Sequence, residues 1–329
     1  LIMTTYKDIR GTHITTVTSD PPAPVNGQMW YNSTDQVMKG FTESPVGSWA
    51  AGGSLNTARQ SQAGLGTQTA ALSVGGSQTK TETEQYDGTS FSEVNDLNTG
   101  RKGAMGSGTT TAGLVSGGDT GPTGSGGNGV ANVESWNGTS WTETTNINNG
   151  RQNGGGAGTS TSTLVFGGYD GSRRAYTEYW NGSSWTELND LNEARSGIVG
   201  AGATYDAVVA FGGSPGPSYT AKTENWDGTN WTEVNDLNQA RSDLGSAGIK
   251  TSALAFGGYT PGGVTGKTEL WDGSSWTETT DMSTARYVFG SSGATQTAAL
   301  AFGGYTTTAL TNTEEFTAPT TSTVTFTAS

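Results

Sequence analysis

The chain has 329 residues, a mass of 33.8 kDa, 10 Trp, 11 Tyr and 52 Gly, which together suit one large all-β domain or two domains of average size. Its net charge of −13 argues against nucleic acid as a partner, because phosphate binding needs clustered Lys and Arg. The absence of Cys excludes disulfides and thiol chemistry, and the sequence has no run of about 18 apolar residues that would insert into a membrane.

Residues 1–35 precede the repeated part of the chain. They are rich in Thr and contain the proline-rich run Asp20–Pro24, which is typical of a linker. We expect an N-terminal arm or anchor here, and we expect no independent domain at either end of the chain.

The chain from about residue 36 repeats one pattern six times, at intervals of 42 to 50 residues. Each copy has an Arg, a Gly-Gly pair whose second Gly lies 17 or 18 residues later, and a Glu that opens an aromatic segment. Only the loop between the Gly-Gly pair and the Glu varies in length, which is typical of a rigid scaffold with one tolerant loop per unit. The six Arg are Arg59, Arg101, Arg151, Arg195, Arg241 and Arg286, and the six Glu are Glu84, Glu134, Glu178, Glu224, Glu269 and Glu314.

Each copy contains segments that suit four short strands. Small residues such as those in 200–202 follow the Arg and suit an innermost strand, where large side chains would collide. An apolar strand then leads to the Gly-Gly pair, as in residues 253–258. After the variable loop, a third strand ends in an aromatic residue, and an outer strand begins with another aromatic after an Asp-Gly or Asn-Gly turn.

The two aromatic residues of a copy are five positions apart. This spacing places the rings opposite each other on one face of a hairpin, where each ring buries on the order of 150–250 Å². Rings of this kind also stack on sugars, but their strict repetition favours packing between neighbouring units. The pairs are Tyr86/Phe91, Trp136/Trp141, Trp180/Trp185, Trp226/Trp231 and Trp271/Trp276.

This order of residues resembles the kelch repeat, over residues 37–316. The short Asp-Gly and Asn-Gly turns, and Phe91 in place of Trp, depart from that pattern. The resemblance implies an all-β fold, namely a six-bladed kelch-like β-propeller of four-stranded blades. It implies no particular activity, because kelch propellers serve many unrelated functions.

The two ends of the repeated region complement each other. The last copy stops at residues 313–316 and lacks an outer strand, whereas residues 48–54 supply an outer strand without the first half of a copy. We expect N- and C-terminal strands to join in one blade and so close the ring. Residues 37–41 are the alternative to 313–316 in this blade. The predicted parts are an arm at 1–35, a propeller at 36–316 and a Thr-rich tail at 317–329, which could add one strand.

The sequence carries no catalytic motif. Its single His, His13, excludes a catalytic triad with His and a zinc site built from His. An acidic pair for glycoside hydrolysis would have to come from Asp119, Asp170, Asp206 and Asp243, which no spacing pairs. We predict a protein that is not an enzyme and that uses no metal or cofactor.

The kelch resemblance implies that the variable loops and the loops containing the six Arg share one face of the ring. The six Arg would then form a basic ring at the mouth of an axial channel, suited to carboxylate ligands. The alternative, which strict repetition favours, is that each Arg pairs with a neighbouring carboxylate such as Asp236 or Glu224. A ligand-specific site should instead break the symmetry, as the 119–130 loop does. The candidate binding residues are the six Arg with Asp119, Tyr169, Asp170, Arg173, Arg174, Tyr219 and Tyr259.

A second resemblance lies in residues 24–34, which read Pro-Val-Asn-Gly-Gln-Met-Trp-Tyr-Asn-Ser-Thr, and in the later Gly47-Ser48-Trp49. These segments resemble parts of tail-fibre and other virion proteins of tailed phages, especially marine ones. The resemblance implies a virion structural protein that binds other virion proteins through residues 1–35 and a host surface glycan or protein through its loop face. Its oligomeric state is left open. The alternatives are a secreted or envelope kelch module of a cell, and a glycan-active enzyme.

Overall fold

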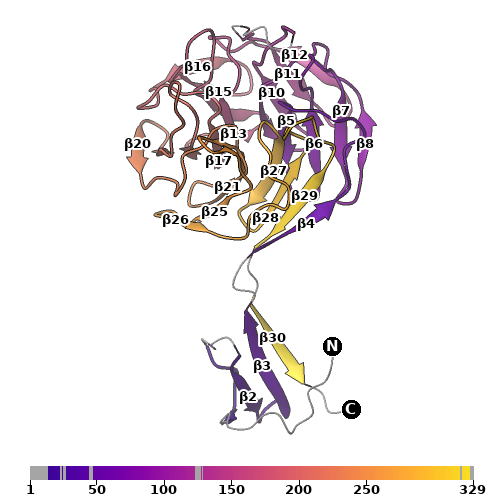
Figure 1. Cartoon of the computed structure of the whole chain (residues 1–329), viewed down its shortest axis with the longest axis vertical. Coiled ribbons are helices and arrows are strands. Elements are labelled where there is room, and N and C mark those ends of the chain that lie inside the picture. The colour runs from indigo at the N-terminus through magenta and orange to yellow at the C-terminus, as the bar shows by residue number, and fades with distance from the viewer. Residues whose placement is uncertain are drawn as a thin grey trace. The chain divides into compact units, whose positions relative to one another are not determined.

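The computed structural model describes residues 14–22, 24, 27–43, 47–122, 127, 129–318 and 321–326, with 41–43 and 321–326 described by their backbone alone. These residues form strands, turns and isolated bridges and contain no helix, so the predicted all-β class is confirmed. They divide into a larger unit, Ser48–Ala318, and a smaller unit, Leu1–Gly47 with Pro319–Ser329 (Figure 1).

The described part of the larger unit contains six four-stranded antiparallel sheets, an arrangement consistent with a β-propeller. The first sheet consists of β5 (Ala63–Gly66), β6 (Ala71–Val74), β7 (Thr83–Tyr86) and β8 (Phe91–Val94), and the second of β9 (Met105–Gly108), β10 (Gly113–Ser116), β11 (Val133–Trp136) and β12 (Trp141–Thr144). The third consists of β13 (Gly155–Thr159), β14 (Ser162–Phe166), β15 (Thr177–Trp180) and β16 (Trp185–Leu188), and the fourth of β17 (Val199–Thr204), β18 (Ala207–Phe211), β19 (Thr223–Trp226) and β20 (Trp231–Val234). The fifth consists of β21 (Gly245–Ile249), β22 (Ser252–Phe256), β25 (Thr268–Trp271) and β26 (Trp276–Glu278), with a small hairpin of β23 (Tyr259–Thr260) and β24 (Gly263–Val264) between β22 and β25.

The sixth sheet joins the two ends of the larger unit. It consists of β27 (Gly290–Thr295), β28 (Ala298–Phe302), β29 (Thr313–Thr317) and, as its outer strand, β4 (Ser48–Gly52). Phe316 lies opposite Trp49 in the register of β29 and β4, with 5.2 Å between ring centroids, so the missing sixth aromatic pair forms across the two ends. The predicted pairing of residues 48–54 with 313–316 is therefore confirmed.

The first strand of each sheet lies beside the first strand of the next one, and β27 lies beside β5 (Figure 1). One residue just before each first strand takes part in a run of backbone hydrogen bonds, which we call the axial hydrogen-bond ring. Each of these residues donates its backbone N–H to the carbonyl of the equivalent residue one repeat earlier (2.6–3.0 Å). The N–H of Ser61, in the first repeat, donates to the carbonyl of Val288 in the last one. The members are Ser61, Gly103, Asn153, Gly197, Asp243 and Val288, all with φ between 47° and 64°.

The first strands approach one another so closely that only small residues fit. A Cβ atom on Gly64 would lie 2.3 Å from the carbonyl oxygen of Ser291, and one on Gly106 would lie 2.6 Å from the carbonyl oxygen of Gly64. Both distances are shorter than any ordinary carbon–oxygen contact. The expected run of small residues in the innermost strands is thus confirmed.

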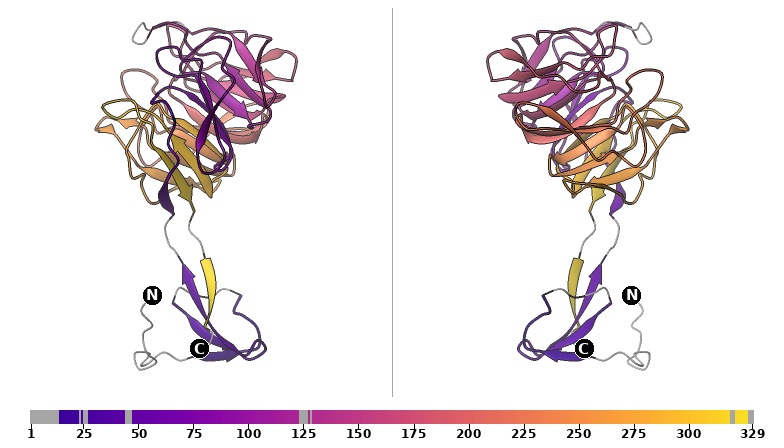
Figure 2. Two further views of the ribbon diagram at one scale, coloured as in Figure 1. Left: turned by 90° about the vertical axis from the view of Figure 1, so that its right-hand side faces the viewer. Right: turned by 90° about the vertical axis from the view of Figure 1, so that its left-hand side faces the viewer.

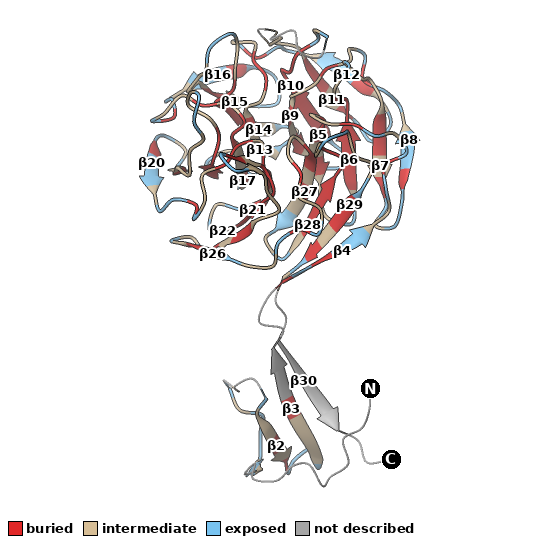
Figure 3. Ribbon diagram, in the orientation of Figure 1, coloured by how far each residue is buried: buried red, intermediate tan, exposed pale blue. Residues whose placement is uncertain are grey.

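The hydrophobic core consists of clusters that fill the space between neighbouring sheets. Trp136 and Trp141 of the second sheet pack against Leu65 and Leu72 of the first. The indole N–H of Trp141 donates to the hydroxyl of Thr83 in the first sheet (3.1 Å). All five predicted aromatic pairs lie directly opposite in register with centroids 4.8–5.3 Å apart, and all are buried, so their predicted role in packing is confirmed (Figure 3).

The smaller unit contains a four-stranded sheet in the order β1 (Thr15–Val17), β2 (Met29–Asn32), β3 (Val37–Glu43) and β30 (Thr321–Phe326). β1 pairs with β2 in parallel, and β3 pairs with β30 antiparallel (Figure 2). We expected no independent domain at either end; the two ends of the chain form this unit together, and the tail adds the one strand that we allowed for. Residues 37–43, which we assigned to the propeller, belong to this sheet.

Candidate functional site

The six repeated Arg do not form an exposed basic ring. The side chains of all six are fully buried, and each forms an ion pair with the Glu of its own sheet. The pairs are Arg59–Glu84, Arg101–Glu134, Arg151–Glu178, Arg195–Glu224, Arg241–Glu269 and Arg286–Glu314. A ligand at the surface does not reach these guanidinium groups. Of the two predictions for the six Arg, the structure therefore shows the second, in which each Arg pairs with a neighbouring carboxylate.

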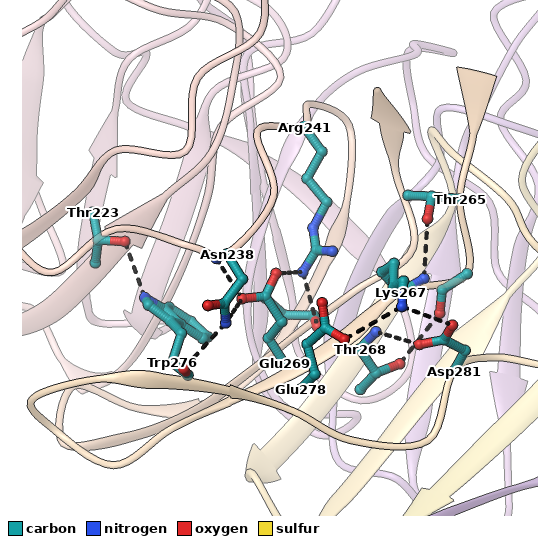
Figure 4. A network of polar contacts seen from close by, with 12 residues as sticks. Thr223, Asn238, Arg241, Thr265, Lys267, Thr268, Glu269, Trp276, Glu278 and Asp281 are labelled. Carbon is teal, nitrogen blue, oxygen red and sulfur yellow. Dashed lines mark hydrogen bonds and ion pairs between the residues drawn. The ribbon is translucent and has the colours of Figure 1, made fainter. Parts of the chain in front are cut away.

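The fifth sheet illustrates the arrangement (Figure 4). Nη2 of Arg241 lies 2.9 Å from Oε1 of Glu269, and the backbone and side-chain nitrogens of Asn238 donate to Oε2 over 2.7 and 2.8 Å. Asn238 also donates to the carbonyl of Trp276 (3.1 Å). Burial lowers the pKa of Arg241 from its ordinary value, although the neighbouring Glu269 opposes this shift. The carboxylate therefore ties the chain that arrives from the fourth sheet to the fifth sheet, which is a structural role.

The variable loops contain the remaining candidates. Asp119 is buried and forms an ion pair with Lys102 (2.7 Å). Asp170 accepts from Nε of Arg174 with both carboxylate oxygens (2.8 Å each), and this hydrogen bond raises the pKa of Arg174. Nε of Arg173 donates to the carbonyl of Ser214 in the next loop (3.0 Å). These contacts order the loops and link neighbouring ones.

In five of the six repeats, the residue after the Arg and the residue after the Gly-Gly pair face each other through an antiparallel bridge. The bridged pairs are Lys102/Asp119, Gln152/Tyr169, Ser196/Ser214, Ser242/Tyr259 and Tyr287/Tyr305. The backbone pairing is the same in all five, but no two of them carry the same pair of side chains. The repeats therefore differ in the side chains at these two positions.

Tyrosines occupy three of the bridged positions in the fifth and sixth sheets, and Tyr219 of the loop after β18 lies beside them. Tyr219 lies 5.7 Å from Tyr259, Tyr259 lies 5.0 Å from Tyr287, and Tyr287 lies 5.8 Å from Tyr305, measured between ring centroids. We call these four residues the tyrosine array. Sequence reasoning found Tyr219 and Tyr259 but missed Tyr287 and Tyr305. An alignment of the repeats could have found Tyr305, which occupies the same position as Tyr169 and Tyr259.

A cavity of about 220 Å³ runs between the first strands of the six sheets and is lined mainly by Gly, Ala and Ser. Asp243 is the only carboxylate in its lining. Burial raises the pKa of Asp243, and the hydroxyl of Ser242 donates to its Oδ2 (2.7 Å), which opposes that shift. One carboxylate without a second acid or base does not form a glycosidase pair.

The four acidic candidates for catalysis are engaged separately. Asp119 pairs with Lys102, Asp170 pairs with Arg174, and Asp243 faces the axial cavity. Asp206 lies in the turn between β17 and β18. Within the described residues, no group of three or more His, Cys, Asp or Glu is placed to hold a metal ion, and no helix is long and apolar enough to cross a membrane. His13 and residues 123–126 and 128 of the 119–130 loop lie outside the described residues.

Comparisons with known proteins give no identification. The chain matches no family model, and no curated protein sequence matches it either.

Proposed function

We propose that this chain is a non-enzymatic structural protein of a phage virion, of the fibre or decoration type. Its larger unit would present the loop face to a glycan or protein on the host surface. The observation that carries the proposal is the contrast between a repeated interior and an unrepeated loop face. Six equivalent Arg–Glu pairs hold the scaffold, whereas the five bridged pairs of the loop face each have a different combination of side chains. Recognition sites are commonly built in this way, on variable loops of a rigid framework.

The proposal includes a closed, six-bladed propeller of the kelch type. The pairing of β4 with β29 and the axial hydrogen-bond ring support closure, because the ring of hydrogen bonds returns to its first residue. Closure leaves no exposed edge between the first and last blades, which suits a protein that is exposed to the environment.

The attachment to the particle is assigned to the smaller unit. The residues that resemble phage proteins, Gly27–Asn32, run into β2, and Trp30 of that strand is fully buried. The sheet also contains β30, so the attachment would use residues from both ends of the chain and not residues 1–35 alone.

The proposal is tested by quantitative mass spectrometry of virus-like particles. These particles are purified by density from the culture in which the gene for this chain occurs. A fixed copy number per major capsid protein is expected. If the chain is absent from particles but present in envelope or secreted fractions, the virion proposal fails and a cellular kelch-type interaction module takes its place.

A further inference from the structure

The tyrosine array is not needed to build the fold. The bridged positions that hold Tyr287 and Tyr305 in the sixth sheet hold Ser196 and Ser214 in the fourth, with the same backbone pairing. The aromatic pairs of the repeat behave differently, since their rings are repeated and buried between sheets. The array is confined to three neighbouring sheets and its rings are only half-buried. Its presence therefore calls for a role other than packing.

The array rests on an ordered backbone. Tyr259 belongs to the small hairpin β23–β24 and exchanges two backbone hydrogen bonds with Ser242 (2.9 and 3.0 Å). Tyr287 and Tyr305 exchange two more with each other (3.0 and 3.2 Å). Neighbouring rings are tilted by 58° to 87°, so that they present edges and hydroxyls as well as faces. Rings fixed in this way lose little conformational entropy when a ligand binds.

The chemistry of the array favours a carbohydrate over a protein surface. Protein interfaces have an apolar centre, whereas the only exposed large apolar side chain in the described part of the chain is Ile249, at the far end of β21 from Asp243. Tyrosine offers an apolar ring for the C–H face of a sugar and a hydroxyl for its polar rim. Within the part of the chain that the structure describes, the hydroxyls of the four tyrosines make no hydrogen bond. They are therefore free to bond to a ligand. From this geometry we infer that Tyr219, Tyr259, Tyr287 and Tyr305 bind a neutral glycan, an inference that rests on the proposed binding role of the loop face.

The charges around the array argue for a neutral ligand. The array itself contains no cation, and the carboxylate of Asp243 is close enough to Tyr287 to contribute to its raised pKa, after burial and the neighbouring tyrosines. The phenol group of Tyr287 therefore stays protonated and able to donate a hydrogen bond. An acidic glycan would find no cation within the array to pair with its charge.

The test uses the full-length chain and immobilised neutral oligosaccharides, namely maltohexaose, cellohexaose, chitohexaose and mannan oligomers, with polysialic acid as the acidic comparison. We expect binding to at least one neutral oligosaccharide. Tyr259→Ala and Tyr287→Ala should each weaken it by about tenfold or more, which corresponds to the loss of one stacking contact. Tyr219→Ala, which truncates a loop residue outside any strand, should weaken it as well and covers the case in which the other two variants do not fold.

Tyr205→Ala is the matched control. Tyr205 is also half-buried and stacks on Tyr179 at 3.9 Å, but it lies in the turn before β18, whereas the variable loop follows that strand. Its replacement should leave glycan binding unchanged. Binding of none of the neutral oligosaccharides, binding of polysialic acid or a host surface protein alone, or unchanged affinity in folded tyrosine-array variants would each overturn the inference.

These outcomes separate the inference from the proposed function. If the chain is found in virions and its tyrosine-array variants still bind glycan normally, the inference fails and the virion proposal stands. A chain that binds glycan through the array but is absent from virions overturns the virion proposal alone.

Discussion

The interior of each sheet holds one guanidinium and one carboxylate that are removed from water together. An isolated buried charge is strongly unfavourable, so each partner is tolerated only because the other lies beside it. Glu269 gains further from two N–H donors of Asn238, which belong to the chain segment that follows the fourth sheet. The repeated Arg and Glu thus fix how one sheet follows another.

Arg241→Ala should destabilise the larger unit by about 3–5 kcal/mol, because it leaves Glu269 buried without a compensating charge. Urea unfolding followed by tryptophan fluorescence measures the change. Arg174→Ala is the matched control. Arg174 also pairs with a carboxylate, that of Asp170, but 36% of its side chain is exposed, so its loss should change stability far less than the loss of Arg241. Equal effects of the two substitutions would contradict the structural role of the buried pair.

In the smaller unit, Asp20 links the proline-rich segment to the sheet. It accepts hydrogen bonds from Lys39, Asn32 and Trp30 over 2.9–3.0 Å. These bonds, that from Lys39 first, lower the pKa of Asp20 from 3.8 to about 2. The folded-state pKa lies below the unfolded one, so the stability that Asp20 contributes is present above about pH 4 and is lost as the pH falls through about 2.

The indole N–H resonance of Trp30 should therefore shift as the pH falls through about 2 in ¹H–¹⁵N NMR spectra. Asp20→Asn keeps an acceptor oxygen but carries no charge, and it should remove this pH dependence. A Trp30 resonance that titrates identically in the variant would show that another group is responsible.

At the scale of the element, the first strands are limited by backbone contact more than by side-chain packing. The Cβ atom added by Gly64→Ala would lie 2.3 Å from the carbonyl oxygen and 2.6 Å from the nitrogen of Ser291. Because neither backbone atom can move without displacing β27, we expect a loss of about 1–3 kcal/mol in the free energy of unfolding.

Gly216→Ala is the matched control for this prediction. A Cβ atom on Gly216, in the loop after β18, meets no atom within 4 Å. Its effect on urea unfolding should stay within about 0.5 kcal/mol. A Gly64→Ala protein as stable as the Gly216→Ala protein would mean that the first strands are less tightly packed than described.

Elements that the repeat encodes six times could be predicted from sequence. The four strands of each sheet, the buried aromatic pairs and the small innermost residues all follow from local spacing. The axial hydrogen-bond ring could not be predicted, because its six members are Ser, Gly, Asn, Gly, Asp and Val and share only a backbone conformation. The burial of the Arg was left as one of two alternatives, because spacing along the chain does not show on which side of a loop a side chain lies.

At the scale of the whole molecule, the sequence showed how the two ends of the chain pair where they complete a copy of the repeat. It did not show how they pair outside the repeat. β4 was found because Trp49 and Phe316 fill the places of a missing aromatic pair. β3 and β30 pair with each other but belong to no repeat, so the spacing along the chain did not show that the tail, which was expected to add one strand, would pair with residues 37–43. The composition of the proline-rich run suggested a linker. The partners that hold Asp20 against the sheet lie 10 to 19 residues away along the chain, so the local sequence did not reveal them.

The joining strand β4 gives a prediction for the larger unit as a whole. The fragment 48–318 keeps β4, whereas the fragment 53–318 lacks it. Trp49 is buried, packs against Phe256 and Phe316, and donates its indole N–H to Thr268 of the fifth sheet (3.1 Å). The loss of one buried Trp alone removes about 3–5 kcal/mol, and the loss of the strand also exposes the edge of β29, which favours association between chains.

We therefore expect fragment 48–318 to unfold cooperatively in urea as a monomer. Fragment 53–318 should be less stable by more than about 3 kcal/mol and should self-associate in sedimentation velocity experiments. If the two fragments were equally stable and monomeric, β4 would be a peripheral strand, and the larger unit would not depend on the pairing of its two ends.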